Sequence, residues 1–420
     1  MKLLKKFFLW SGIFLLVFVL IAGTCLLVWN KLPELYARRS ILDLSKYARD
    51  INDIKISKST RILSLGEASH GNKEFQELKL SLLKKVVAED DVRSFCLEAD
   101  FGEGLYIDDY IKGKRESIDL NKVFSFNIYH SKEMKDLVEW MRFYNESKKD
   151  KDKLSFYGFD IQNPEKTAAY ILDFCKMNNI EIAQTSKDIL DDMAKAKSKV
   201  RGKSGEEIRN NLSKLKPVFK DYPLIKRSIE NIVVGLDYYS MDMKDYIRVN
   251  NFRDKSMAEN IGFISSYENN RGYDRIMISG HNWHVRKSSL GKKDYKPMGQ
   301  YLTEAFHDGY FVVGTDYYKT LCNINEVGKG VARGNHSFCS ADILAEKARY
   351  FKGKYYLDFA SLGDGQSKKV INSKIKMGSL GEGYSFLMKI VPKTHRVEEV
   401  PSKLYDGMYF IYEASPIETE

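Results

Sequence analysis

The feature that most constrains the fold is a repeated alternation of short apolar runs with longer amphipathic segments, which begins at residue 61. The apolar runs have the length of buried strands, and the segments between them carry apolar residues at helical spacing. Because neighbouring parallel strands need crossover connections, which helices usually supply, this rhythm predicts an α/β fold with a mostly parallel central sheet and helices on both faces. The strands are expected at Arg61 to Leu65, Ser94 to Leu97, Leu154 to Tyr157, Arg275 to Ile278, Tyr310 to Val313, Lys354 to Phe359, Tyr384 to Ile390 and Met408 to Tyr412.

Two segments depart from this rhythm. Between Thr185 and Val249 no comparable strand occurs, and lysine-rich amphipathic sequence predicts a helical insertion at about 185–249. Glu34 to Ile54 carries apolar residues at helical spacing and is expected to form a lead-in helix. With 43% hydrophobic residues, the remaining chain has enough apolar side chains for one large folded domain.

The N-terminus carries an uncharged apolar run of 23 residues, Phe7 to Trp29, directly after three lysines. As a helix this run would be about 34 Å long, enough to cross the hydrocarbon core of a bilayer. A cleaved signal peptide is the rival interpretation, but the run is longer than the usual apolar h-region of a signal peptide and lacks an A-x-A site near its end. Acylation of Cys25 is a further alternative. We predict a cytoplasmic segment 1–6, a single transmembrane anchor 7–29, a lead-in helix or linker 30–60 and an extracytoplasmic domain 61–420.

Neither the net charge nor the cysteine pattern indicates a nucleic-acid-binding protein or a zinc protein. The net charge is +10, but the lysines are scattered and no arginine-rich stripe is interleaved with aromatic residues, so nucleic-acid binding is not expected. The five cysteines show no CxxC or zinc spacing, and at most a bridge between Cys322 and Cys339 is conceivable.

Acidic residues and histidines gather immediately after the predicted strands. The first strand is followed by Gly66-Glu67-Ala68-Ser69-His70-Gly71, the second by Glu98-Ala99-Asp100, the third by Gly158-Phe159-Asp160 and the fourth by Gly280-His281-Asn282-Trp283-His284. In open α/β sheets ligands bind outside the carboxyl ends of the strands. One such pair alone usually reports helix capping or a surface hydrogen bond. Their repetition after buried strands is difficult to explain by core packing, because a carboxylate there needs a partner or a function.

The spacing within the loops suggests a local geometry. Glu67 and His70 are three residues apart, as are His281 and His284, so each pair shares a face if the chain turns into a helix. Ser69 is a plausible cap for a helix through Val87. The positive end of that helix is expected to disfavour protonation of His70 and to keep it available as a base.

These motifs together resemble the erythromycin esterase family. The resemblance rests on Gly66 to Gly71 with Glu74-Phe75, on Leu97 to Phe101 and on Gly280 to His284. Lesser matches at Trp140-Met141-Arg142, Tyr157 to Asp160, Arg253-Asp254, Met298-Gly299 and Tyr405-Asp406-Gly407 extend it from about Ile41 to Ile417. The resemblance implies that 61–420 is an esterase-like catalytic domain that needs no cofactor and hydrolyses a small-molecule ester or a macrolide lactone, with antibiotic resistance as the family's known role. No G-x-S-x-G elbow occurs, which agrees with a mechanism without a serine nucleophile.

The resemblance also implies roles for particular residues. His70 is expected to be the general base, and Glu67, Glu98, His281 and His284 to be the other catalytic groups, with one carboxylate orienting the imidazole and a histidine stabilising the oxyanion. Lys79 occupies the position where the esterases tend to have arginine. Lysine lacks the forked guanidinium with which arginine makes bidentate hydrogen bonds. The expected substrate-binding residues are Lys79, Glu74, Asp160 and Trp283.

Two other interpretations of the same residues stay open. Glu67, His70, Glu98, His281 and His284 are also suitable ligands for a divalent metal, which would generate a nucleophile from bound water. Alternatively, the cleft belongs to a membrane-tethered protein that binds a metal, haem or an envelope ligand without turnover. The remaining histidines lie in ordinary polar sequence and are expected to be structural or exposed: His130, His307, His336 and His395.

Overall fold

The structure is a computed structural model that describes residues 2–196, 204–289, 294–328 and 332–419. In these ranges a nine-stranded sheet forms the centre of the molecule, in the order β3-β2-β4-β1-β5-β11-β7, with β6 and β9 also paired to β5. A small second sheet joins β8 and β10. The strands are β1 Ile62–Glu67, β2 Ser94–Asp100, β3 Ser155–Asp160, β4 Ile276–His281, β5 Tyr310–Glu326, β6 Arg333–Cys339, β7 Lys354–Asp358, β8 Ile375–Gly378, β9 Gly383–Tyr384, β10 Arg396–Glu399 and β11 Gly407–Ala414.

The central sheet is mostly parallel. Each neighbouring pair from β3 through β2, β4, β1 and β5 to β11 is parallel, whereas β7 and β6 are antiparallel to their partners. The predicted fold class is therefore confirmed. The carboxyl ends of the parallel strands point to one edge, where the polar loops meet.

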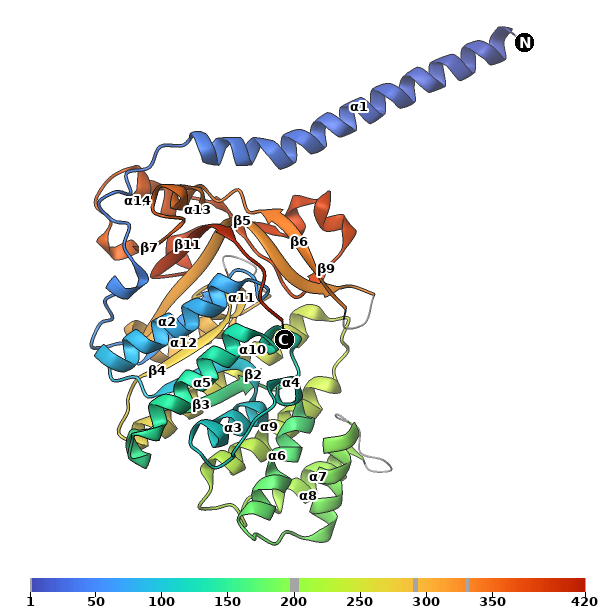
Figure 1. The fold of residues 1–420 in the computed structure, drawn as a ribbon. Helices are drawn as coiled ribbons and strands as arrows, with labels where there is room; N and C mark the ends of the chain where they lie inside the picture. The colour runs from blue at the N-terminus through green and yellow to red at the C-terminus, as the bar shows by residue number, and fades with distance from the viewer. Residues whose placement is uncertain (1, 197–203, 290–293, 329–331, 420) are drawn as a thin grey trace.

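Two hydrophobic layers lie on opposite faces of this sheet. Successive strand residues alternate between them, so that Ile62 belongs to one layer and Leu63 to the other. Helices α2 (Lys73–Glu89) and α5 (Lys132–Glu146) cover one face, and α6 (Pro164–Met177), α9 (Pro223–Tyr239) and α10 (Tyr246–Asn270) cover the other. The layers around the sheet are seen in Figure 1. The remaining helices are α3 Phe101–Ile111, α4 Leu120–Val123, α7 Gln184–Ala196, α8 Gly205–Ser213, α11 Asn282–Val285, α12 Met298–Phe306, α13 Ile343–Lys347 and α14 Gln366–Ile371.

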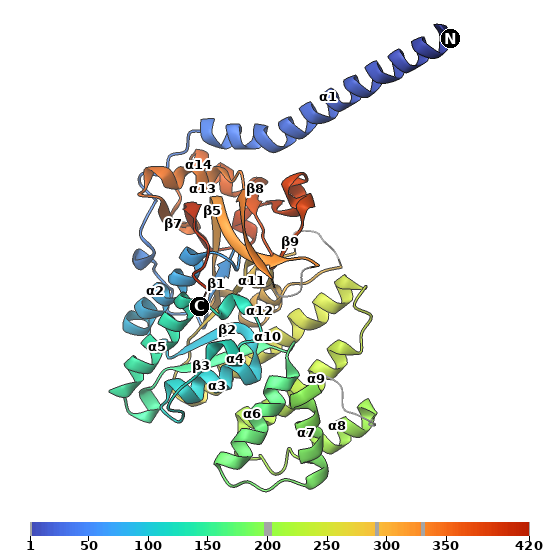
Figure 2. The ribbon, with the colours of Figure 1, turned by 45° about the vertical axis from the view of Figure 1, so that its right-hand side comes forward.

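The segment at 185–249 contains α7, α8 and α9 and the start of α10, with turns between the helices in its described residues. These helices project from the end of the domain that lies far from the N-terminus, as Figure 2 shows from a second direction. Residues 197–203 of this segment lie outside the described residues.

The N-terminal helix α1 (Lys2–Arg39) extends away from the domain, with its apolar side chains exposed (Figure 1). It is the one helix in the described chain that is long and apolar enough to cross a membrane, although a signal sequence satisfies the same test. Helix α1 ends at Arg39, and the expected separate helix over Glu34 to Ile54 is wrong. Beyond Arg39 the chain is irregular as far as a 3₁₀ turn at Ile51–Asp53.

Other local expectations are also wrong. Tyr384 to Ile390 forms a two-residue strand and then a 3₁₀ turn, Phe386–Lys389, and β6, β8 and β10 were not anticipated. Helix α2 begins at Lys73 after Asn72, so Ser69 does not cap it; the Ser69 hydroxyl instead accepts the Gly71 N–H. Cys322 and Cys339 are free thiols, because the β5–β6 register places His336 opposite Cys322.

Candidate active site

The predicted polar loops meet at the carboxyl edge of the sheet. Strands β1 and β4 are neighbours in parallel register, which pairs Glu67 with His281. An open cavity of about 250 Å³ lies in front of this edge. It is lined by His70, Glu98, Phe126, Ile128, Tyr129, Gln162, Arg253, His281, His284, Gly381 and Glu382.

His70 and Glu67 form one polar pair beside the cavity. The Nδ1 atom of His70 lies 3.5 Å from Glu67 Oε2, a distance at the limit of a hydrogen bond. Glu67 is completely buried, and its other oxygen accepts from the Lys79 ammonium at 2.7 Å. Gln76 donates to Glu67 at 3.0 Å and also to the His70 carbonyl, so one amide group positions both the carboxylate and the His70 backbone.

This arrangement makes His70 more basic than an ordinary histidine. Burial lowers the pKa of His70, but the hydrogen bond and negative charge of Glu67 outweigh it, and the net pKa is raised above 6.5. For Glu67, burial raises the pKa, but the Lys79 ammonium and His70 together lower it to about 2. The expectation that a helix N-terminus disfavours protonation of His70 is therefore wrong, because the neighbouring carboxylate dominates.

A second polar group is centred on Arg253 of α10. Its guanidinium donates to both oxygens of Asp160, at 2.9 and 2.7 Å, and to Glu98 at 2.8 Å. Glu98 also accepts the backbone N–H of His281 at 2.7 Å. A Cβ at Gly280 would lie 2.8 Å from Glu98 Oε2, so glycine there lets the carboxylate approach β4. Burial opposes the charge of Glu98, but His284 and Arg253 hold its pKa well below the usual range.

His284 is oriented by a carboxylate behind it. Its Nδ1 lies 2.8 Å from Asp254 Oδ1, and Tyr295 donates to the other oxygen of Asp254 at 2.8 Å. The Nε2 atom faces Arg253 Nη1 at 3.2 Å and Glu98 at 3.5 Å. Burial lowers the pKa of His284, but the charges of Asp254 and Glu98 raise it above 6.5 overall.

His281 has both ring nitrogens engaged. Its Nδ1 accepts the Trp283 N–H at 3.3 Å, and its Nε2 lies 3.1 Å from the Leu380 carbonyl, to which it donates. Burial and the neighbouring imidazoles of His70 and His284 lower its pKa to about 3. His281 is thus a neutral imidazole with its ring 4.9 Å from that of His70.

The expected catalytic residues converge, whereas the expected substrate-binding residues do not reach the cavity. Lys79 is fully buried behind Glu67, and Asp160 is fully buried behind Arg253. Glu74 accepts the Ser415 N–H, because it lies on the first turn of α2, which packs against the C-terminal segment. Trp283 stacks on Tyr295 and the Arg286 guanidinium, on the side of α11 away from the cavity.

Arg253, Tyr129 and Glu382 are among the residues that line the cavity and were not assigned a role from the sequence. Arg253 belongs to one of the lesser family motifs, and that motif could have identified it as a site residue. Tyr129, whose hydroxyl donates to the Glu98 carbonyl at 2.9 Å, lies in a 3₁₀ turn that has no distinctive pattern. Glu382 is held by Arg333 at 2.8 Å in the loop after β8, a strand that was itself missed.

The five residues considered as metal ligands are arranged differently from a metal site. Within the described ranges no group of three or more His, Cys, Asp or Glu side chains could hold a metal ion. The physical reason is that Lys79 and Arg253 already neutralise Glu67 and Glu98, and a metal ion would have to compete with these cations.

The fold and this site define an α/β protein whose cavity, at the carboxyl edge of a parallel sheet, is lined by histidines with carboxylate partners. The model of the erythromycin esterase family matches residues 87–414, more than half of the chain, so the chain belongs to the erythromycin esterase family. The match includes Glu98, Arg253, His281 and His284 and begins after the Glu67–His70 loop. Membership supports a hydrolase of this type and a small-molecule substrate.

Individual relatives are distant. Erythromycin esterase type II of Escherichia coli is 26% identical over 300 residues, which cover 63% of this chain and 70% of that protein. A crystal structure described as a succinoglycan biosynthesis protein has a TM-score of 0.72 at 18% identity and covers 92% of this chain and 99% of its own. A mutant of the erythromycin esterase EreC in its open conformation has a TM-score of 0.58 at 15% identity, with 86% and 92% covered. At these identities the solved structures show the fold alone.

Proposed function

We propose that this protein is a membrane-anchored hydrolase that cleaves an ester or lactone with water activated by His70. The observation that carries the proposal is the His70–Glu67 pair beside the cavity, in a chain of the erythromycin esterase family. Helix α1 would supply the anchor and place the domain outside the cytoplasm.

In the proposed reaction His70 acts first as a base and then as an acid. Its Nδ1–H faces Glu67, which leaves Nε2 to take a proton from water as that water attacks the ester carbonyl. The proton then goes to the departing alkoxide. Glu67 stabilises the imidazolium that forms in between, and Lys79 keeps Glu67 ionised.

Positive charge for the oxyanion would come from Arg253 and His284. Both line the cavity, and the Arg253 guanidinium is fixed in place by Asp160. His281 is a poorer candidate for this role, because its single N–H is bound to the Leu380 carbonyl. Preorganised donors of this kind usually contribute more to the rate than any other single term.

The size of the cavity bears on the substrate. Sites for drug-sized ligands usually enclose about 300–1,000 Å³. A cavity of about 250 Å³ accommodates the reacting ester and its nearest substituents, so a macrolide would need the site to open. A cavity of this volume favours a smaller ester as substrate, and the anchor favours one found at the cell envelope.

The test is hydrolysis of a panel of simple esters and erythromycin by the wild type and His70→Ala. A positioned acid or base is worth about 10² to 10⁴ in rate, and we expect at least that loss with little change in thermal midpoint. His307→Asn is the control, because His307 is exposed and asparagine tolerates its positive φ. Hydrolysis by His70→Ala near the wild-type rate would refute the proposal. Ligand retention by the wild type without turnover would favour the binding protein instead.

A further inference from the structure

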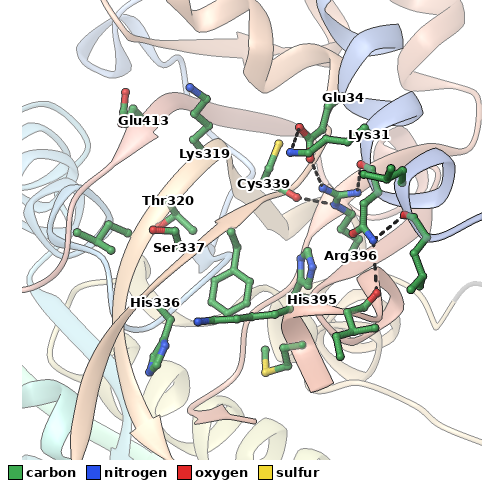
Figure 3. A pocket seen from close by; sticks show the side chains of 18 of the residues that line it. Lys31, Glu34, Lys319, Thr320, His336, Ser337, Cys339, His395, Arg396 and Glu413 are labelled. Atoms are coloured by element: carbon green, nitrogen blue, oxygen red, sulfur yellow. Dashed lines mark hydrogen bonds and ion pairs between the residues drawn. The ribbon is translucent and has the colours of Figure 1, made fainter. Parts of the chain in front are cut away.

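A second and larger cavity lies where the N-terminal helix meets the domain, beside the middle of β5. It has a volume of about 1060 Å³ and is open to solvent. Its walls are the last turns of α1, strands β5 and β6, and the segment from Met388 to Arg396 (Figure 3). We call it the anchor cavity.

The C-terminal part of α1 is held firmly on the domain. Arg396, which is 7% exposed, donates to the Asn30 carbonyl, to Glu34 and to the Cys339 carbonyl of β6. Figure 3 shows the guanidinium between α1 and β6 with these bonds. Arg38 donates to Tyr318 at 3.0 Å, and Lys347 donates to the Ala37 carbonyl at 2.9 Å.

This attachment fixes where the anchor cavity stands relative to a bilayer. The apolar run ends at Trp29, and the next residue, Asn30, donates to the Ile390 carbonyl at 3.4 Å. Three residues of the run itself line the cavity, Gly23, Leu26 and Leu27. If the run spans the membrane, one end of the cavity lies at the depth of the acyl chains and the other at the headgroups.

The neighbouring surface has the composition of a membrane interface. Phe386, Leu387 and Ile390 are 69%, 54% and 37% exposed, although they are large apolar side chains. Lys389 and Lys393 are exposed in the same segment. Apolar side chains flanked by lysines are typical of segments that rest in the bilayer interface, where the lysines reach the headgroups.

The polar end of the anchor cavity favours an anion. Of the described residues that line it, five are lysine or arginine and two are glutamate. Glu34 is bound by Arg396 and Lys31, and Glu413 lies across from Lys319 in the β5–β11 register, whereas the described structure gives Lys389 no carboxylate partner. Ser337 lines the cavity beside Lys319 (Figure 3), whereas the hydroxyl of Thr320 is buried and accepts from Asn72.

We propose that the anchor cavity binds an anionic phospholipid of the surrounding bilayer. Lys319 and Lys389 supply positive charge for the anionic headgroup from two sides of the cavity, and the acyl chains run along Leu26 and Leu27 and over the exposed apolar side chains. The bound lipid fills the space between α1 and the domain and holds the domain on the membrane surface. This inference rests on the membrane anchor of the proposed function and is independent of the proposed hydrolysis.

The test uses the full-length chain in detergent micelles and native mass spectrometry. Phosphatidylglycerol or phosphatidylcholine with the same acyl chains is added to the wild type and to Lys319→Glu/Lys389→Glu. Because each lysine near a lipid surface contributes several-fold to binding of an anionic lipid, we expect the double variant to lose at least about tenfold in affinity for phosphatidylglycerol. Lys148→Glu/Lys149→Glu makes the same charge change at the end of α5, away from α1, and should bind like the wild type.

Several outcomes would overturn the proposal. Equal binding of the two lipids, or equal loss in both double variants, would exclude an anionic-lipid site in the cavity. Displacement of the lipid by inorganic phosphate at similar concentration would indicate a site for soluble anions. Lys319→Gln/Lys389→Gln repeats the test without charge reversal if the first variant does not fold. Hydrolysis and membrane fractionation of the same samples separate a failure of this inference from a failure of the proposed function.

Discussion

Replacing Lys79 with methionine tests whether this buried lysine positions the catalytic pair or binds substrate. The ammonium group lies 2.7 Å from Glu67, and neither side chain is more than 1% exposed. Methionine occupies a similar volume without the charge, so Lys79→Met leaves the Glu67 carboxylate buried and unpaired. The pKa of Glu67, now lowered to about 2, should rise, and its support of His70 should weaken.

The magnitude follows from this burial. Removing one partner of a buried ion pair costs about 3–5 kcal/mol. With an unfolding entropy of about 2.1 cal/mol/K per residue, roughly 390 residues outside the anchor give about 0.8 kcal/mol/K, so the thermal midpoint should fall by about 4–6 °C. The turnover number should fall about tenfold or more, while KM changes little, because Lys79 does not line the cavity.

The assay combines thermal unfolding with steady-state kinetics on one ester. Lys84→Met is the matched control, since Lys84 is an exposed lysine on the same helix and its replacement should leave both quantities nearly unchanged. A higher KM with an unchanged thermal midpoint would refute this reasoning and restore Lys79 as a substrate-binding residue.

Four further outcomes are expected. Glu67→Gln should lower the pKa of His70, so the acidic limb of the kcat/KM profile should move to lower pH and the maximum should fall. An acidic limb at the wild-type pH would show that Glu67 does not set the pKa of the base. Arg253→Lys keeps the charge but loses the fork to Asp160, and kcat/KM should fall about tenfold or more, as steady-state kinetics would show. Deleting residues 1–29 should move the folded protein from the membrane fraction to the soluble fraction. Recovery of the full-length chain in the soluble fraction would contradict the membrane anchor. A chelator should leave hydrolysis unchanged, and loss restored by added metal would favour the metal-dependent scheme.

Much of the fold was predictable because the determining signals are local. Each apolar run that predicted a parallel strand overlaps an observed strand, from β1 to β5, since a buried strand needs a short continuous apolar segment. Strands β8 and β10 were missed because each has only four residues and is partly buried, and β10 carries three charged residues in Arg396–Glu399. Their pairing depends on tertiary contacts, and no apolar run in the sequence indicates these strands.

The sequence by itself determined that glutamate and histidine gather at one edge of a parallel sheet, because these residues directly follow apolar runs along the chain and the carboxyl ends of parallel strands share one edge. Only the tertiary structure decided which cation pairs with which carboxylate. Arg253 comes from α10, yet it joins Asp160 of β3 to Glu98 of β2, and Lys79 lies behind Glu67, out of reach of the cavity. Such pairings follow from the packing of α2 and α10 against the sheet, and a buried carboxylate accepts whichever cation that packing brings within hydrogen-bonding distance.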